Sequence, residues 1–214
     1  FGADEIRVLF KLLEAHDEET SADAARAIGN VSLTDHTRTL VADHIGGIRA
    51  LSAALRSPNE TCVLYASRCV NRLAALESIQ GQLLQADVVG NLLHVLQPLV
   101  TEASSSSSVL AVAVGEQTTA DGEGESERNA LRSSIVNEVL KSLVNVSAHA
   151  RSAVHMIRLG SHVALCSTVA ACSASMTPKR RLNAHGLKLA LMCLVNLSKF
   201  VQLELYTGLV ESRM

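Results

Sequence analysis

The sequence predicts an all-α solenoid, in which helices stack side by side around one continuous core. A short pattern returns four times along the 214 residues, and apolar residues recur every three or four positions, which is the helical period. Aromatic residues make up only 2% of the chain, so a core from 48% hydrophobic residues must consist mainly of Leu, Val, Ile and Ala. Such a core suits closely packed helices better than sheets.

The repeated pattern is a helix that in three of its copies ends in Asn, an aliphatic residue and Ser. Its copies lie at 25–32, 67–74, 140–147 and 191–198. The equivalent residues, here called the ladder position, are Asn30, Arg72, Asn145 and Asn196. The first two lie 42 residues apart, and a similar spacing separates the next two once a non-repetitive stretch beginning at Thr101 is set aside. The last two lie 51 residues apart, with about nine extra residues around 173–181.

A second element precedes each copy, and its pattern predicts a turn followed by an amphipathic helix. It occupies 2–13, 45–55, 86–96 and 159–165. Its glycines predict a sharp turn from a short first helix into the second. Pro58 and Pro178 predict breaks before the third helix. Each unit is therefore expected to contain a short helix, a second helix and a longer third helix.

The chain resembles the armadillo-repeat family. The residues that carry the resemblance are Gly-Gly-Ile-Arg-Ala-Leu at 46–51, followed by a helix of the type that ends in Asn-Val-Ser or Asn-Leu-Ser. The resemblance implies a right-handed α-solenoid of three-helix repeats, and HEAT-like repeats with two helices per unit are the alternative. The implied units are approximately 1–33, 34–75, 76–148, 149–199 and the start of a further unit at 200–214. The partial units at both ends and the missing initiator Met lead us to expect a longer parent chain.

One stretch, 101–128, does not fit the repeat. It contains five consecutive serines at 104–108 and an acidic run at 121–127. Such a composition buries too little apolar surface to offset the entropy lost on ordering, so we expect a disordered insert. A sharper hypothesis is that the acidic run folds onto a basic groove as an internal pseudo-ligand.

The family resemblance also implies a binding surface. Third helices line the concave face in that family, and the repeated Asn binds the ligand backbone, which predicts this role for Asn30, Asn145 and Asn196; Arg72 departs from the pattern. One turn earlier on the same face stand Arg26, Arg68 and Lys141, and in the last copy Met192. The three basic residues form a basic stripe together with Arg72 and with Lys199 further along the last helix. The stripe is similar to the β-catenin groove, which implies an extended acidic partner. The absence of Trp argues against a receptor for nuclear localisation signals.

Other function classes find little support in the sequence. A net charge of −2 argues against nucleic-acid binding. No motif for a nucleophile, a phosphate loop or a catalytic metal is present, and His162 with Cys166 supplies only two of the four ligands of a structural zinc site. The longest uncharged stretch, 159–178, contains Pro and several Ser, unlike a membrane span. We therefore expect no enzyme activity, no metal and no cofactor.

The sequence thus predicts a protein–protein interaction scaffold that binds an extended, acidic partner in its concave groove. The alternative is a structural subunit of a large assembly, such as a cytoskeletal or axonemal complex, without a separable peptide ligand. Five cysteines with no CxxC pair indicate a reducing compartment. We expect an intracellular, cytoplasmic protein, with a nuclear or cytoskeleton-associated location as the alternative.

Overall fold

The computed structural model describes residues 2–105, 123–174 and 182–201, and every regular element in these ranges is a helix. The first helices of the units are α3 (Asp35–Asp43), α6 (Gln80–Gln85, after a 3-10 turn at Glu77–Ile79) and α9 (Ala150–Arg158). The second helices are α1 (Ala3–Leu13), α4 (Gly47–Ala54), α7 (Val88–Ser105) and α10 (Ser161–Ala174). The third helices are α2 (Glu18–Val31), α5 (Glu60–Leu73), α8 (Glu123–Ser147) and α11 (Leu182–Ser198).

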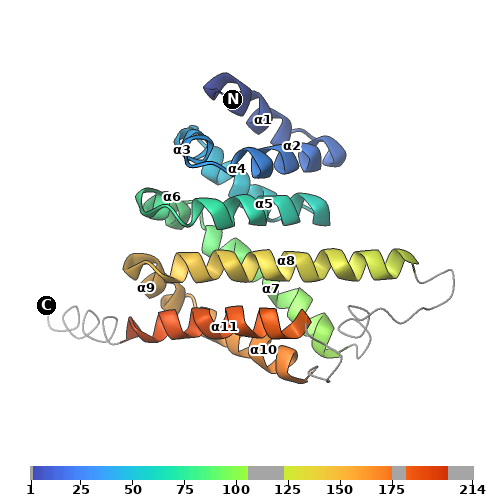
Figure 1. Ribbon diagram of the computed structural model, residues 1–214, viewed down its shortest axis with the longest axis vertical. Coiled ribbons are helices and arrows are strands. Elements are labelled where there is room, and N and C mark those ends of the chain that lie inside the picture. The colour runs from blue at the N-terminus through green and yellow to red at the C-terminus, as the bar shows by residue number, and fades with distance from the viewer. Residues whose placement is uncertain (1, 106–122, 175–181, 202–214) are drawn as a thin grey trace, which may run out of the picture.

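The third helices form a ladder. In Figure 1, α2, α5, α8 and α11 lie one below the other, each in contact with the next. Of the second helices, α4 and α7 pass behind this ladder and α1 lies above α2, while α3, α6 and α9 lie along one edge of the ladder. This is an armadillo-type solenoid of three-helix units, so the predicted fold class is confirmed and the two-helix alternative does not apply.

The third helices α2 and α5 begin where a polar side chain accepts hydrogen bonds from backbone N–H groups of the first turn. Asp17 accepts a hydrogen bond from the backbone N–H of Thr20 at 2.7 Å, and Asn59 accepts from Thr61 and Cys62 at 2.9 and 3.2 Å. These side chains cap α2 and α5, and Pro58 precedes the cap as a residue that cannot continue a helix. The helix starts are therefore local consequences of the sequence.

The turn from first to second helix requires a left-handed residue in each complete unit. Gly46 and Gly160 supply it with φ of +80° and +70°. In the unit between them Asp87 takes this role with φ of +51°, whereas Gly90 lies inside α7. A Cβ on Gly90 would lie 2.4 Å from the Asp87 carboxylate oxygen, so a larger residue at position 90 would displace that side chain. The expectation that a glycine forms each turn is therefore wrong for this unit.

One apolar core runs through the described units and contains residues from all three kinds of helix. Buried polar side chains connect successive units within it. Asn91 of α7 donates to the carbonyl and hydroxyl oxygens of Ser52 on α4, at 3.1 and 2.9 Å. Ser152 of α9 donates to the side-chain oxygen of Gln80 on α6 at 2.9 Å. Because these four side chains bind one another across successive units, the bonds set the register between units as well as their contact.

Both ends of the predicted disordered insert, 101–128, are helical. Residues 101–105 belong to α7 and residues 123–128 belong to α8, so these parts of the 101–128 stretch are helical; 106–122 lie outside the described residues. Extending an existing helix adds one hydrogen bond per residue without a new nucleus, and acidic residues are favourable near a helix N-terminus. The acidic residues 123–127 are thus part of a helix, which corrects the hypothesis of an extended internal pseudo-ligand for that part of the run.

The stretch expected to be irregular around 173–181 is helical in its first two residues, because α10 continues to Ala174. Residues 175–181 lie outside the described ranges. In the parts of the chain that the structure describes, no single helix combines the length and the apolar character needed to cross a membrane.

Candidate groove on the third helices

The residues at the ladder position form one row, and Arg72, Asn145 and Asn196 each bind the third helix before their own. Arg72 donates to the backbone carbonyl of Gly29, Asn145 to that of Asn71 at 3.0 Å, and Asn196 to that of Val144 at 3.3 Å. In every case the acceptor is the residue just before the ladder position of the preceding unit. This constant geometry shows that the sequence register of the four units is also their structural register.

These carbonyls lie in the last turn of α2, α5 and α8, where helices have no internal donors left. The ladder side chains supply the missing donors. Arg72 serves as well as Asn because a cation is favourable at the C-terminal end of a helix. The departure of Arg72 from the Asn pattern therefore preserves the contact between α5 and α2.

The inward bonds limit what the row can offer to a ligand. An Asn amide has two N–H donors. Those of Asn145 go to the carbonyl and side-chain oxygens of Asn71, and those of Asn196 go to the Val144 carbonyl and the Ser147 hydroxyl. Lys199 also donates to the side-chain oxygen of Asn196 at 3.3 Å. Asn30 differs, because its side chain is exposed and no third helix precedes α2 among the described residues.

The inward bonds lead to a stability prediction. We expect Asn145→Ala to lower the free energy of unfolding by about 1–3 kcal/mol, since it leaves the Asn71 carbonyl without its donor. Asn30→Ala is the matched control at the same register position, and it should change stability by less than about 0.5 kcal/mol. Urea unfolding followed by circular dichroism measures both. Equal losses in the two variants would contradict the proposed role of the row.

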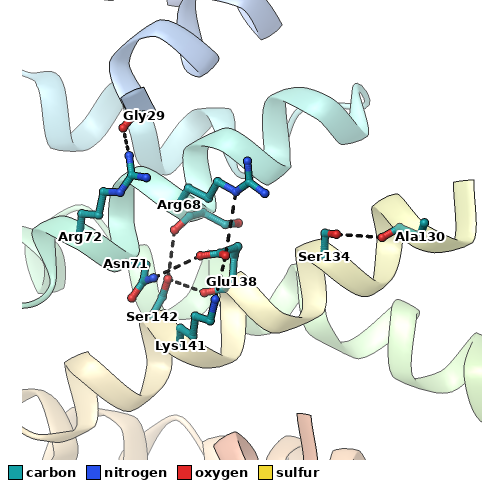
Figure 2. Close-up of polar contacts among 10 residues, drawn as sticks. Gly29, Arg68, Asn71, Arg72, Ala130, Ser134, Glu138, Lys141 and Ser142 are labelled. Carbon is teal, nitrogen blue, oxygen red and sulfur yellow. Dashed lines mark hydrogen bonds and ion pairs between the residues drawn. The ribbon is translucent and has the colours of Figure 1, made fainter. Parts of the chain in front are cut away.

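The basic stripe lies on the same face, one turn earlier in each helix, but its charges are partly paired. Figure 2 shows Glu138 of α8 between Arg68 of α5 and Lys141 of α8. The Glu138 Oε1 atom lies 4.0 Å from the Arg68 Nε and 3.0 Å from the Lys141 Nζ. Asn71 donates to the other Glu138 oxygen at 3.2 Å. Glu138 is only 14% exposed in its side chain, so its carboxylate is held in place between these basic side chains.

Arg26 is paired in the same way on the first helix of the ladder. Its guanidinium lies 3.4 Å from the Asp23 carboxylate and 5.2 Å above the ring of Tyr65. The guanidinium of Arg68 lies 5.1 Å from the same ring. Tyr65 thus contacts two cations by their attraction to an aromatic face. The predicted free basic stripe is therefore, on α2, α5 and α8, a surface of alternating charges in which the basic side chains remain 36–49% exposed.

The residues that sequence reasoning missed share one register position. Asp23, Tyr65 and Glu138 each lie seven residues before the ladder position, one turn before the basic stripe. Each contacts the basic residue of its own helix, by an ion pair at Asp23 and Glu138 and through the ring at Tyr65. Tyr65 and Glu138 also contact the basic residue of the preceding third helix. The register that identified the stripe would have identified them too. On α11 this place is taken by Leu189 and the stripe position by Met192, so the charged surface ends at α8.

No metal-ligand set of three or more His, Cys, Asp or Glu side chains occurs among the described residues. His162 and Cys166 are both exposed on α10. No disulfide joins any of the five cysteines, all of which lie in the described ranges, and four of them are buried. Desolvation raises the pKa of the Cys69 and Cys193 thiols to about 11, so both are protonated at neutral pH.

No family model matches the sequence, and no curated protein matches it. Solved structures with a similar arrangement include an engineered protein at 16% identity and a TM-score of 0.48, over 93% of this chain and 87% of that one. Computationally designed armadillo repeat proteins for modular peptide recognition match at 15% identity and a TM-score of 0.43, over 86% and 80% of the two chains. A designed armadillo repeat protein in complex with the peptide (KR)4 has the same identity and score, over 90% and 86%. The assignment of the fold therefore depends on the chain's own three-helix units.

Proposed function

We propose that this protein is an interaction scaffold that binds an extended segment of a partner protein along α2, α5 and α8. The observation that carries the proposal is the row of half-exposed basic side chains Arg26, Arg68 and Lys141, which repeats at one position per unit. A rigid row with a fixed spacing suits an extended chain with acidic side chains at matching intervals. The scaffold has no catalytic role of its own in this proposal.

The details of the groove refine the expected partner. Asp23 and Glu138 already neutralise part of the basic charge, so a partner carboxylate must compete with them or bridge between the exposed edges of the guanidinium groups. Asn30 is the ladder residue with an exposed amide, which supports backbone recognition at the α2 end. We therefore expect the acidic residues of the partner to lie over α2 and α5.

Charge reversal tests the proposal. We expect Arg26→Glu, Arg68→Glu and Lys141→Glu together to weaken binding of an acidic extended peptide by well over tenfold, on the order of 1.4 kcal/mol or more. The control carries the same change of charge at exposed positions away from the groove: Lys11→Glu, Arg49→Glu and Arg151→Glu. Fluorescence polarisation with labelled Asp/Glu-rich peptides, and with Lys-rich peptides for comparison, measures the affinity. Equal affinity of the groove variant, the control variant and the parent chain would exclude the groove as the site.

A second variant tests the role of the internal anion. Glu138→Gln keeps the shape and removes the charge that pairs with Arg68 and Lys141. In this proposal the variant binds the acidic peptide more tightly, by roughly the few-fold that one partly exposed charge contributes.

The alternative function is a structural subunit of a larger assembly. The inward bonds of Asn145 and Asn196 favour it, because they leave no ladder N–H for a ligand on α8 and α11. A partner that co-purifies in fixed stoichiometry, together with no salt-sensitive binding of acidic peptides, would support this reading. We propose a reducing, intracellular compartment in either case, and five cysteines without a disulfide among them support this proposal.

A further inference from the structure

The segment between α4 and α5 contains the dipeptide Ser57-Pro58. Because α4 ends at Ala54 and α5 begins at Glu60, the dipeptide lies outside both helices. Pro58 is exposed and Ser57 is partly exposed. A residue before proline favours an extended conformation over a helical one. A proline-directed protein kinase binds its substrate as an extended chain and selects a serine that is followed by an accessible proline, and this segment offers both.

The Ser57 hydroxyl can react as a nucleophile. Its oxygen accepts a hydrogen bond from the backbone N–H of Asn59 at 3.2 Å, which occupies a lone pair and not the hydroxyl proton. The start of a third helix does not require this serine or the proline after it. At the same register α2 has Ala15-His16, and it is capped by Asp17 as α5 is capped by Asn59.

Side chains that can carry a positive charge line the same cavity as Ser57. This cavity of about 240 Å³ is lined, among others, by Arg56, His94 and Arg132. Its acidic residue is Glu60, whose carboxylate accepts from the Nε atom of Arg132 at 2.8 Å. The two side chains are 31% and 27% exposed, so water still reaches this ion pair. A phosphate on Ser57 would therefore meet a guanidinium group that one carboxylate already holds in place.

The length of α8 places Arg132 in this cavity. Arg132 lies thirteen residues before the ladder position, which is the register of the cap residues Asp17 and Asn59. Because α8 begins well before this register, it carries a helical arginine where α2 and α5 carry their caps. The ion pair between Glu60 and Arg132 thus joins the first turn of α5 to the interior of α8.

The Glu60 carboxylate has space to move away from Arg132. A second cavity, of about 760 Å³, is lined by both of these residues as well. Arg128, one turn before Arg132 on α8, lines the second cavity and is exposed. A carboxylate displaced from the first cavity therefore stays in contact with water and close to another basic side chain, which keeps the cost of displacement low.

We propose that Ser57 is a phosphorylation site for a proline-directed serine/threonine kinase, and that the phosphate replaces Glu60 as the partner of Arg132. In the transfer the Ser57 Oγ atom forms a bond to the γ-phosphorus of ATP, the bond from that phosphorus to the β,γ-bridging oxygen breaks, and ADP leaves. The hydroxyl proton passes to a carboxylate of the kinase. A phosphate carries a charge of about −1.5 to −2 at neutral pH, so it binds a guanidinium group more strongly than one carboxylate does. None of these residues belongs to the basic stripe or to the row at the ladder position.

Phosphorylation of the folded 214-residue chain tests the site. Thr177 also precedes a proline, so every chain carries Thr177→Ala. The kinase is a proline-directed kinase that phosphorylates a synthetic peptide with the sequence of residues 51–64. With this kinase and Mg-ATP we expect mass spectrometry to find one phosphate on Ser57, and none at this position in Ser57→Ala or Pro58→Ala.

The rate of phosphorylation separates a site in the folded chain from one reached only by unfolding. A rate below about a thousandth of the peptide rate would mean that the kinase acts on the unfolded fraction alone, and it would overturn the proposal. So would a peptide that no proline-directed kinase modifies.

A titration followed by phosphorus NMR tests the exchange of partners in the phosphorylated chain. A paired guanidinium group favours the dianion, so we expect the second pKa of the phosphate to lie below about 6 and to rise by at least about half a unit in Arg132→Gln. Arg128→Gln removes the same charge one turn earlier and should change this pKa by less than about 0.2 units, since solvent screens it. His94 is present in all three chains, so its own titration cancels in the comparison. Equal pKa values in the parent chain and in Arg132→Gln, or equal shifts in both variants, would overturn the exchange.

Discussion

Leu140→Ala is expected to lower the free energy of unfolding by about 2–5 kcal/mol, the range for truncating a fully buried leucine. Leu140 is a residue of α8, is 0% exposed and faces α11. Its Cδ1 atom would lie 3.8 Å from a Cβ added to Gly186 of α11. Because Gly186 has no side chain that could fill the space left by the leucine, the substitution leaves a cavity. Because each unit of a solenoid contacts only its neighbours, the loss also weakens the coupling of α11 to the rest of the array.

Leu191→Ala is the matched control in the same 214-residue chain. It removes the same atoms at the same register position, but from a side chain that is 45% exposed. We expect a loss below about 1 kcal/mol. Urea unfolding followed by circular dichroism measures both variants, and an additional early transition for α11 is expected with Leu140→Ala. If the two variants lost equal stability, the assignment of the repeat register would be wrong.

Alkaline pH is expected to destabilise the protein through its buried thiols. Burial raises the pKa of Cys69 and of Cys193 to about 11 from an ordinary value of 9.0. Below pH 9 the thiols are protonated in the folded and in the unfolded chain, and their contribution is fully present. Between about pH 9 and 11 the unfolded chain releases these protons whereas the folded chain holds them, so stability falls as the pH rises.

The size of this effect follows from the linkage relation. Each thiol lowers the free energy of unfolding by at most about 1.4 kcal/mol per pH unit in this window, so the two together lower it by up to about 5 kcal/mol at its upper end. Unfolding curves at pH 8, 9 and 10 measure the slope. In the variant with Cys69→Ala and Cys193→Ala, that part of the slope should disappear, while the contributions of Lys and Tyr remain. An unchanged slope in the double variant would show that these thiols ionise as easily in the folded protein as in the unfolded chain.

Much of the fold was open to sequence reasoning because its causes are local. The glycines at 46 and 160 and Pro58 before α5 each act within a few residues of the helix they shape. The wrong predictions concern places where the same local sequence is compatible with two backbone conformations. Asp87 replaced a glycine in one turn, since Asp is among the residues that tolerate a left-handed conformation. The acidic residues from Glu123 onward extended α8, because a helix already packed along its length elongates easily.

The candidate groove was less predictable. The ladder position and the basic stripe follow from the repeat, but their partners do not. Asn71 and Glu138 lie 67 residues apart in the chain, and no pattern within one unit indicates that they meet. The same applies to the bond from Asn145 to Asn71, which turns a predicted ligand contact into a contact between helices.

The sequence by itself determined that the chain is a helical solenoid, how many residues make one unit and which four residues share a register, because helical periods and turns depend on neighbours in the chain. The tertiary structure alone decided which charges are paired, which amides are used inside the protein and which face of α11 stays open. Those properties depend on the distance between side chains of successive units, and stacking, rather than order in the chain, sets that distance.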